Sequence, residues 1–252
     1  MRTRLLVVQP SEVDPAERLG DWLADAGADL RGCQPARDGV PETLDGVDAV
    51  VCLGGEMGAH DDADHPWLAA LRSLLADAVV RRLPVLGVCL GGQLLAAATG
   101  GAVRRANGGP EAGTLLIAKR DAAAHDPLFA QLPLTPDVIQ FHHDEIHRLP
   151  PGSTLLASSP RYPNQAFRVG AAGYGLQGHI ETSPATVLSW ARRDDAGVFP
   201  AAQLDPDHLE QVHADIAQAW RPLAVRFVAL AAGELAPAGG SGGRRALPLL
   251  RS

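Results

Sequence analysis

The segment PVLGVCLGGQ, residues 84–93, constrains the fold more than any other part of the chain. An apolar run enters the motif GVCLG, which is centred on Cys89, and the small-residue stretch LGGQLLAAATG overlaps its end. A Gly-x-Cys-x-Gly pattern is typical of a nucleophile elbow, a sharp strand-to-helix turn in which glycines leave room for a strained central residue. The motif therefore predicts a strand that ends before Cys89 and a helix that starts after it.

Short apolar runs alternate with longer amphipathic stretches around this motif. We predict strands at 5–8, 47–55 and 83–88, and helices at 14–28, 65–82 and 90–100. Strands separated by helices of this length pair in parallel through right-handed crossovers. The first hundred residues therefore predict an α/β three-layer sandwich with a central, mostly parallel sheet.

The pattern changes after residue 100. Short strand-like runs follow one another closely, separated by Gly, Pro and Asn: AVRRA, TLLIAK, DVIQFHH, STLLASS, QAFRV and GYGLQGHI. Such spacing predicts added antiparallel strands beside the parallel sheet. Helices are expected at 184–194 and within 207–232. We expect one domain, residues 1–232, followed by a flexible tail rich in Gly and Pro at 233–252.

Composition excludes several classes of protein. The 252 residues are 46% hydrophobic and 20% charged, which suits one large α/β domain. The formal net charge of −7 argues against nucleic acid as a partner, because phosphate binding needs a surplus of Lys and Arg. No apolar run approaches the roughly 20 residues of a membrane helix. We interpret the N-terminus, MRTRLLVVQP, as the first strand of a cytoplasmic protein rather than a signal peptide.

The three cysteines differ in their surroundings. Their odd number and the lack of a CxxC pair indicate neither a disulfide framework nor a zinc site, and no cofactor is predicted. At the elbow, the positive end of the following helix favours a thiolate at Cys89, and the Leu90 N–H offers half of an oxyanion hole. The alternative is that Cys89 is a small buried hydrophobic residue. That alternative is favoured for Cys33 and Cys52, which lie within strand-like runs.

A thiolate nucleophile needs a base, and the base needs a group that orients it. His179 lies at the end of the strand-like run GYGLQGHIE, with Glu181 two residues further on. Residues i and i+2 of a strand share a face, so Glu181 could hold the imidazole for Cys89. A structural histidine is the alternative for His179. The remaining candidates in polar loops or on helix surfaces are His60, His65, His125, His208 and His213.

The cluster FHHDEIH raises the alternative of a metal site. His143 and His147 are four residues apart, as in the helix of zinc proteases. However, Asp144 stands where that motif has Glu, and two prolines follow a stretch too short for a helix. A third ligand at a suitable spacing is also lacking, so we predict no metal site.

Taken together, these segments resemble the class I glutamine amidotransferases over roughly residues 4–190. GVCLGGQ is similar to the family's nucleophile motif and LQGHIE to its His-Pro-Glu signature. The resemblance implies a Cys89–His179–Glu181 triad. Ile180 replaces the usual proline of the signature, and Gly178 replaces a usual aromatic residue. Both replacements alter the expected wall of the substrate pocket.

The resemblance also implies a substrate pocket. LGGEMGAHDDADHPWL is similar to the family's Gly-Gly loop, in which the Gly55 backbone completes the oxyanion hole with Leu90. PEAGTLLI and FHHDEIHRLP are similar to its Glu-x-Gly and His-x-Asp segments. The substrate-binding residues implied in this way are Gly54, Met57, Gln93, Glu111, Gly113, His142 and Asp144.

Three functions remain open from the sequence. The first is a glutaminase that hydrolyses the γ-amide of glutamine through a γ-glutamyl thioester. Its ammonia is released or passed to a separate synthetase subunit, as in the stand-alone, GMP-synthase-like branch, because no synthetase domain follows residue 252. The second is a γ-glutamyl peptidase that acts on γ-glutamyl peptides or conjugates. The third is an inactive binding or regulatory module that keeps the fold.

Overall fold

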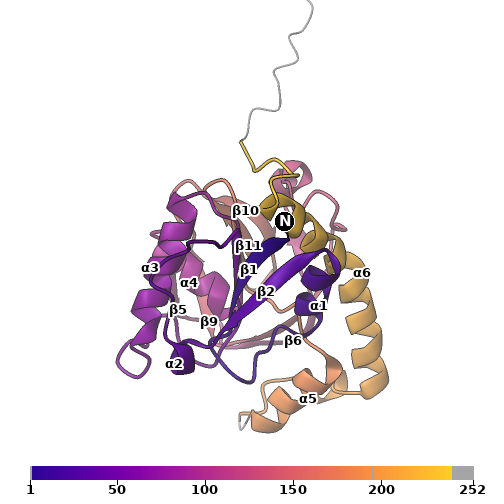
Figure 1. The fold of residues 1–252 in the computed structure, drawn as a ribbon. Coiled ribbons are helices and arrows are strands. Elements are labelled where there is room, and N and C mark those ends of the chain that lie inside the picture. The colour runs from indigo at the N-terminus through magenta and orange to yellow at the C-terminus, as the bar shows by residue number, and fades with distance from the viewer. Residues whose placement is uncertain (1, 195, 240–252) are drawn as a thin grey trace, which may run out of the picture.

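An eight-stranded sheet forms the centre of the computed structural model, which describes residues 2–194 and 196–239 (Figure 1). The strands follow the order β2-β1-β3-β4-β12-β11-β10-β7. Their bounds are β2 Ala28–Cys33, β1 Thr3–Val8, β3 Ala49–Cys52, β4 Val85–Val88, β12 Gly173–Leu176, β11 Ala166–Val169, β10 Thr154–Ser158 and β7 Ala118–Lys119. The first five strands of this order are parallel, and the last three continue the sheet in antiparallel pairing.

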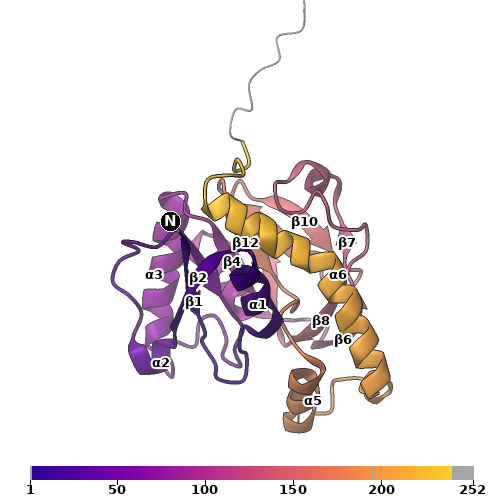
Figure 2. The same ribbon diagram turned by 45° about the vertical axis from the view of Figure 1, so that its right-hand side comes forward.

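Helices cover both faces of the sheet, as Figures 1 and 2 show. Helices α3 (Trp67–Val80) and α4 (Leu90–Ala98) pack on one face, and α1 (Glu17–Asp25) and α6 (Pro206–Ala231) on the other. Residues of β1 alternate between two apolar clusters: Leu5 and Val7 pack with α1 and α6, whereas Leu6 and Val8 pack with α3 and α4. The predicted three-layer sandwich is confirmed.

Two small antiparallel sheets lie outside the main sheet. One pairs β5 (Ala102–Arg105) with β9 (Asp144–Arg148), and the other pairs β6 (Glu111–Leu116) with β8 (Asp137–His142). Strand β8 also makes an isolated antiparallel bridge to His179, with N–H···O distances of 3.0 and 2.7 Å between Ile139 and His179. The second sheet therefore holds the segment that follows β12.

The structure differs from the prediction in several places. The run TLLIAK, predicted as one strand, is divided between β6 and β7, which belong to different sheets. Strand β2 and the short helix α2 (Pro35–Asp38) were not expected, because the β2 sequence ADLRGC lies at a sheet edge and lacks an apolar pattern. The helix expected at 14–28 begins only at Glu17, after a turn. GYGL, grouped with the antiparallel strands, pairs in parallel with β4 and antiparallel only with β11. The run DEIHR, for which no strand was predicted, forms strand β9.

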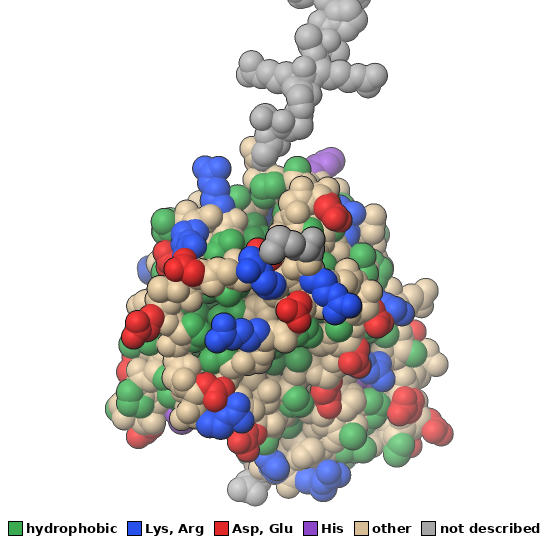
Figure 3. Space-filling view, in the orientation of Figure 1, with side chains coloured by type: hydrophobic (Ala, Val, Ile, Leu, Met, Phe, Trp, Pro, Cys, Tyr) green, Lys and Arg blue, Asp and Glu red, His purple; other side chains and the backbone are tan. Residues whose placement is uncertain are grey.

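The remaining helices lie in the second half of the chain. They are α5 (Pro184–Arg193) and the short 3-10 helices η1 (Asp121–His125) and η2 (Ala201–Gln203). Within residues 2–194 and 196–239, no helix combines the length and apolar character needed to cross a membrane. On the face drawn in Figure 3, acidic and basic side chains are interspersed.

The segment expected to form a flexible tail begins as an ordered extension of α6. Leu235 packs against the apolar cluster beneath α6, and the Ala238 N–H donates to the carbonyl oxygen of Ala171 at 3.2 Å. The rest of the predicted tail, 240–252, lies outside the described residues.

Candidate active site

Cys89 occupies a strained turn between β4 and α4. Its backbone angles, φ +49° and ψ −109°, lie in a region that side-chain-bearing residues rarely adopt. The turn brings backbones together: a Cβ on Gly91 would lie 2.0 Å from the Cys52 carbonyl oxygen, and one on Gly87 would lie 2.5 Å from the Gly91 backbone. Only glycine fits at these two positions, so the motif forms the nucleophile elbow that the sequence predicts.

The start of α4 lies directly behind the sulfur. Leu90 is the first residue of this helix, so its N–H belongs to the helix end that has no intrahelical acceptor. The Cys89 N–H is used by the sheet, donating to the Leu176 carbonyl oxygen at 2.8 Å. This arrangement leaves the positive end of α4 next to the Cys89 thiol.

His179 and Glu181 form a buried pair beyond the end of β12. The imidazole Nδ1 lies 2.6 Å from Glu181 Oε1, and the Ile180 N–H donates to the other carboxylate oxygen at 2.8 Å. The side chains of His179 and Cys89 line the same cavity. The Trp190 ring of α5 packs on the imidazole, with ring centroids 4.7 Å apart. Sulfur, imidazole and carboxylate therefore meet at the carboxyl ends of neighbouring parallel strands.

The surroundings of His179 favour its protonated form. Burial by itself lowers the pKa of His179, but the charge of Glu181, which is hydrogen-bonded to Nδ1, and the neighbouring Cys89 raise this pKa well above its ordinary value. The other two thiols are in different surroundings. Burial raises the pKa of Cys52 to about 12 and also raises the pKa of Cys33, so both remain protonated.

A cavity of about 400 Å³ opens beside Cys89 and His179. The sequence-predicted residues that line it are Gly55, Met57, Cys89, Gln93, His142, Asp144 and His179. Leu90 and Gly54 lie next to these residues in the chain without lining the cavity, and Glu181 lies behind the imidazole. A cavity of this volume falls in the range that binds small molecules.

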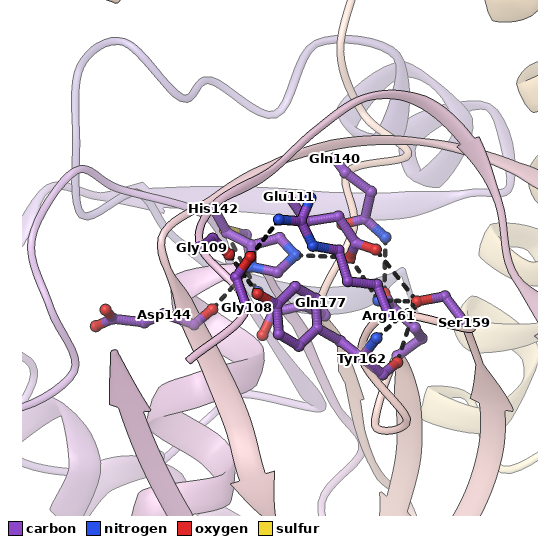
Figure 4. Close-up of polar contacts among 12 residues, drawn as sticks. Gly108, Gly109, Glu111, Gln140, His142, Asp144, Ser159, Arg161, Tyr162 and Gln177 are labelled. Carbon is purple, nitrogen blue, oxygen red and sulfur yellow. Dashed lines mark hydrogen bonds and ion pairs between the residues drawn. The ribbon is translucent and has the colours of Figure 1, made fainter. Parts of the chain in front are cut away.

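Glu111 and Gly113 do not line the cavity, although they were expected to bind substrate. Glu111 is buried behind His142, whose Nε2 lies 3.1 Å from its carboxylate, and accepts further hydrogen bonds from Gln165 and Ser159 at 2.7 and 3.2 Å. Figure 4 shows this carboxylate among its partners. Glu111 therefore orients a residue of the cavity wall rather than contacting a ligand in the cavity.

The loop between β5 and β6 is held by hydrogen bonds from Arg161 and Tyr162. The Arg161 guanidinium and the Tyr162 hydroxyl donate to the carbonyl oxygens of Gly108 and Gly109, as Figure 4 shows.

Gly113 has a φ of +130°, and a Cβ there would lie 2.4 Å from Oε1 of Gln203. Its role is therefore close packing of β6, outside the cavity.

Two glutamines connect the cavity wall to the sulfur. Gln93 donates to the Asp144 carbonyl oxygen at 3.3 Å and to Gln177 Oε1 at 3.4 Å. Gln177, directly after β12, places its amide nitrogen 4.0 Å from Cys89 Sγ. Gln177 was not predicted, although it lies in the LQGHIE segment that carries His179.

Other residues of the cavity were missed by sequence reasoning. They are Val13, Asp14, Glu56, Gly58, Asp61, Arg105, Phe141, His143 and Trp190. Asp14 follows β1 and Glu56 follows β3, and the carboxyl ends of parallel strands are where ligands bind in α/β sheets. That rule could have identified both. No comparable signal marks Trp190 or Arg105, which reach the cavity through tertiary packing.

Two histidine predictions can be compared with the structure. His143 lies between β8 and β9, and His147 lies within β9, so neither is on a helix. No group of three His, Cys, Asp or Glu side chains suited to a metal occurs in the described residues. His213 was expected on a helix surface but is fully buried. Its ring nitrogens contact the Leu209 carbonyl oxygen at 2.7 Å and the Thr182 hydroxyl at 3.2 Å. Burial lowers its pKa.

Comparisons with known proteins agree with this geometry. A family model described as glutamine amidotransferase class-I matches residues 37–187. Gamma-glutamyl peptidase 5 of Arabidopsis thaliana is 36% identical over 140 residues, 55% of this chain and 55% of the peptidase. The glutamine-hydrolyzing GMP synthase of Christiangramia forsetii is 32% identical over 149 residues, 58% of this chain and 27% of the synthase.

A solved structure extends the likeness over most of the chain. A glutamine amidotransferase from Thermotoga maritima matches with a TM-score of 0.78 and 27% sequence identity, covering 90% of this chain and 99% of that one. The matched region spans about half the length of the Arabidopsis peptidase and about a quarter of the synthase.

Proposed function

Because the chain belongs to the class-I glutamine amidotransferase family, we propose that it hydrolyses the γ-amide of glutamine with Cys89 as the nucleophile. The observation that carries the proposal is the position of Cys89. Its side chain lines the same cavity as His179, from a turn whose backbone is strained and whose glycines cannot be replaced without a clash. Strain of this kind is concentrated at functional sites.

The proposed reaction is an acyl transfer in two stages. The thiolate of Cys89 attacks the γ-carbonyl carbon, and the C–N bond breaks as His179 gives its proton to the departing nitrogen. Water then hydrolyses the γ-glutamyl thioester to glutamate, with His179 accepting a proton from it. Glu181 holds the imidazole and balances its charge. Ammonia is released, or passes to a separate synthetase where one binds.

Main-chain N–H groups of Leu90 and Gly55 are the proposed oxyanion donors. Leu90 begins helix α4, and Gly55 lines the cavity after β3. Loss of one such donor costs about 10²–10³ in rate in comparable enzymes, so the Gly54-Gly55 loop matters as much as the triad.

The test is glutamine hydrolysis by the purified chain, followed by ammonia release and by mass spectrometry of the thioester. We expect Cys89→Ser to lower kcat on the order of 10³-fold or more while the fold survives. The matched control is Cys33→Ala, which removes a protonated thiol that does not line the cavity, so we expect turnover to stay unchanged. Undiminished activity of Cys89→Ser contradicts the assignment.

A second measurement separates the roles of the base and its partner. His179→Ala removes the group that moves the proton, whereas Glu181→Gln keeps a hydrogen-bond acceptor beside Nδ1. We therefore expect the histidine variant to lose more kcat than the glutamine variant. The reverse order overturns these roles.

A γ-glutamyl conjugate is the second candidate substrate, and the cavity favours it. The cavity extends from the thiol to Asp61 in the loop after β3 and to Arg105 at the end of β5, so it has room beyond a primary amide. A γ-glutamyl peptidase releases the conjugated amine in place of ammonia. A higher kcat/KM for a γ-glutamyl peptide than for glutamine favours this function. If no amide is hydrolysed, the remaining alternative is an inactive binding module.

A further inference from the structure

Three carboxylates line one part of the cavity. Asp14 comes from the segment between β1 and α1, while Glu56 and Asp61 belong to the loop after β3. Ser11 and Glu56 connect the two segments, because the Ser11 hydroxyl donates to the Glu56 carboxylate at 2.6 Å. We refer to Asp14, Glu56 and Asp61 as the acidic wall.

The acidic wall has no basic residue of its own. Among the described residues that line the cavity, Arg105 is the only Lys or Arg, and it lies on β5, 3.8 Å from the carboxylate of Asp144. None of the three wall carboxylates takes part in an ion pair with Lys or Arg within the described part of the chain. The wall therefore presents net negative charge to whatever enters the cavity.

Asp14 is the member of the wall that lies against the imidazole. It is only 7% exposed, yet its carboxylate lines the cavity. Gly54 shows how closely the groups pack: a Cβ there would be 2.5 Å from Asp14 Oδ2 and 3.0 Å from His179 Cε1. Both atoms lie close to the same point beside Gly54, so the Asp14 carboxylate is a near neighbour of the imidazole ring.

The position of the wall relative to His179 decides which part of a substrate it meets. Nδ1 of His179 is held by Glu181, so the other nitrogen must protonate the departing amine. A group attached to the departing nitrogen therefore starts beside the imidazole, where Asp14 lies, in the cavity that Glu56 and Asp61 also line.

On the basis of the proposed function, we propose that the acidic wall selects γ-glutamyl conjugates whose amine part carries a second, positively charged group. A mono-conjugate of an aliphatic diamine has this chemistry. Its amide C–N bond breaks on attack by Cys89, the diamine leaves with a proton from His179, and water converts the thioester to glutamate. A charge-assisted hydrogen bond to the buried Asp14 carboxylate is the strongest contact expected.

The test compares three γ-glutamyl amides of similar length, made from 1,4-diaminobutane, butylamine and 4-aminobutyrate. Their amine parts differ in charge: positive, neutral and negative. We expect kcat/KM to fall in that order, by about tenfold from the first to the second, and the preference to shrink as salt is raised from 0.05 to about 0.5 M. Equal values, or a preference for the negative conjugate, overturn the proposal.

Variants of the wall locate the source of the preference. We expect Glu56→Gln and Asp61→Asn each to lower the ratio of the diamine to the butylamine conjugate about two- to fivefold, the size of an exposed ion pair. Asp64→Asn is the matched control: this exposed carboxylate is on the same loop but does not line the cavity, so the ratio stays unchanged. If the wall instead binds the α-ammonium of the γ-glutamyl group, all three conjugates lose kcat/KM equally, and the proposal is wrong.

Hydrolysis by the unmodified chain and binding to Cys89→Ala together separate this inference from the proposed function. If glutamine and the butylamine conjugate are hydrolysed without a preference for the diamine conjugate, only the present inference fails. If no amide is hydrolysed by the unmodified chain, the proposed function fails. Calorimetry on Cys89→Ala then shows whether the diamine conjugate still binds at least several times more tightly than the butylamine conjugate, and equal affinities overturn the inference as well.

Discussion

The three cysteines illustrate how residue environment sets chemistry. Cys89 lies at a helix start beside an imidazole, whereas Cys52 is completely buried in β3 and Cys33 sits near the edge of the sheet. The same side chain therefore lines a cavity beside an imidazole at one position and is a protonated, buried thiol at the other two. Glycines lie near all three cysteines in the sequence, so the distinction rests on their packing: Gly87 and Gly91 around Cys89 approach other backbone closely, whereas Gly32 beside Cys33 meets no atom within 4 Å.

The contribution of Asp14 to the free energy of unfolding depends on pH. Burial is the main cause that raises the pKa of Asp14 to about 6, against 3.8 ordinarily; Glu181 and Glu56 raise it further, while His179 and Trp190 lower it. The folded state therefore binds this proton more tightly than the unfolded state between pH 4 and 6. Stability contributed by the protonated form is present at pH 4 and is lost as the pH rises through 6.

Replacement of Asp14 by Asn should prevent the loss of unfolding free energy that accompanies ionisation of this carboxyl group. Asp14→Asn removes the titration, so we expect its unfolding free energy to exceed that of the unmodified chain at pH 7.5 by on the order of 2–3 kcal/mol, and to be similar at pH 4. Urea unfolding at the two pH values measures the difference. A stabilisation that is the same at both pH values contradicts this account of the carboxylate.

At the scale of elements, the site depends on how closely α4 approaches the sheet. Gly91, in the first turn of α4, lies against β3, where a Cβ would be 2.0 Å from a carbonyl oxygen. A second contact holds the segment of Glu181: the Arg18 N–H at the start of α1 donates to the Glu181 carbonyl oxygen at 3.1 Å. Glu17 accepts hydrogen bonds from Ser183 and Thr186, which joins α1 to the start of α5.

The close approach of α4 predicts different effects for two glycine substitutions. Gly91→Ala forces α4 away from β3 and should lower the free energy of unfolding by at least about 2 kcal/mol, because the clash is with backbone. Gly32→Ala, in β2, meets no atom within 4 Å and should change it by less than about 0.5 kcal/mol. Urea unfolding of both variants measures this contrast, and similar losses in the two would contradict it.

At the scale of the whole molecule, α6 joins the two parts of the chain. It packs on α1 from the first half and on β8 from the second. The fully buried Trp220 is central, since its indole N–H donates to the Asp137 carbonyl oxygen at 2.8 Å and its ring meets Phe129 edge-on. Loss of this contact should therefore weaken both parts at once.

Trp220→Ala should lower the free energy of unfolding by about 3–5 kcal/mol and preserve a single transition, because both parts share the residue. Val225→Ala is the control on the same helix; Val225 is 47% exposed, and its truncation should cost less than about 0.5 kcal/mol. Near- and far-ultraviolet circular dichroism during urea unfolding measure both. Two separated transitions would contradict the view of α6 as a shared element.

Local pattern was sufficient for much of this molecule. Alternation of short apolar runs with amphipathic stretches predicts β1, β3, β4, α3 and α4, because their periodicity follows from burial on one or both faces. Strand β2 was missed because an edge strand with exposed polar residues carries no such signal. The parallel pairing of β12 with β4 was also missed, since pairing direction depends on where the chain returns.

The sequence by itself determined the elbow at Cys89, the His179–Glu181 spacing and the layered α/β fold, because each follows from interactions between residues close together in the chain or from their periodic burial. Only the tertiary structure decided that Asp14 lies against the imidazole and that Glu111 stands behind His142. Those placements depend on which strand ends meet at the sheet edge, over separations of 165 and 31 residues between the partners in the chain. Contacts of that range arise from packing of the whole sheet, which leaves no mark in a local pattern.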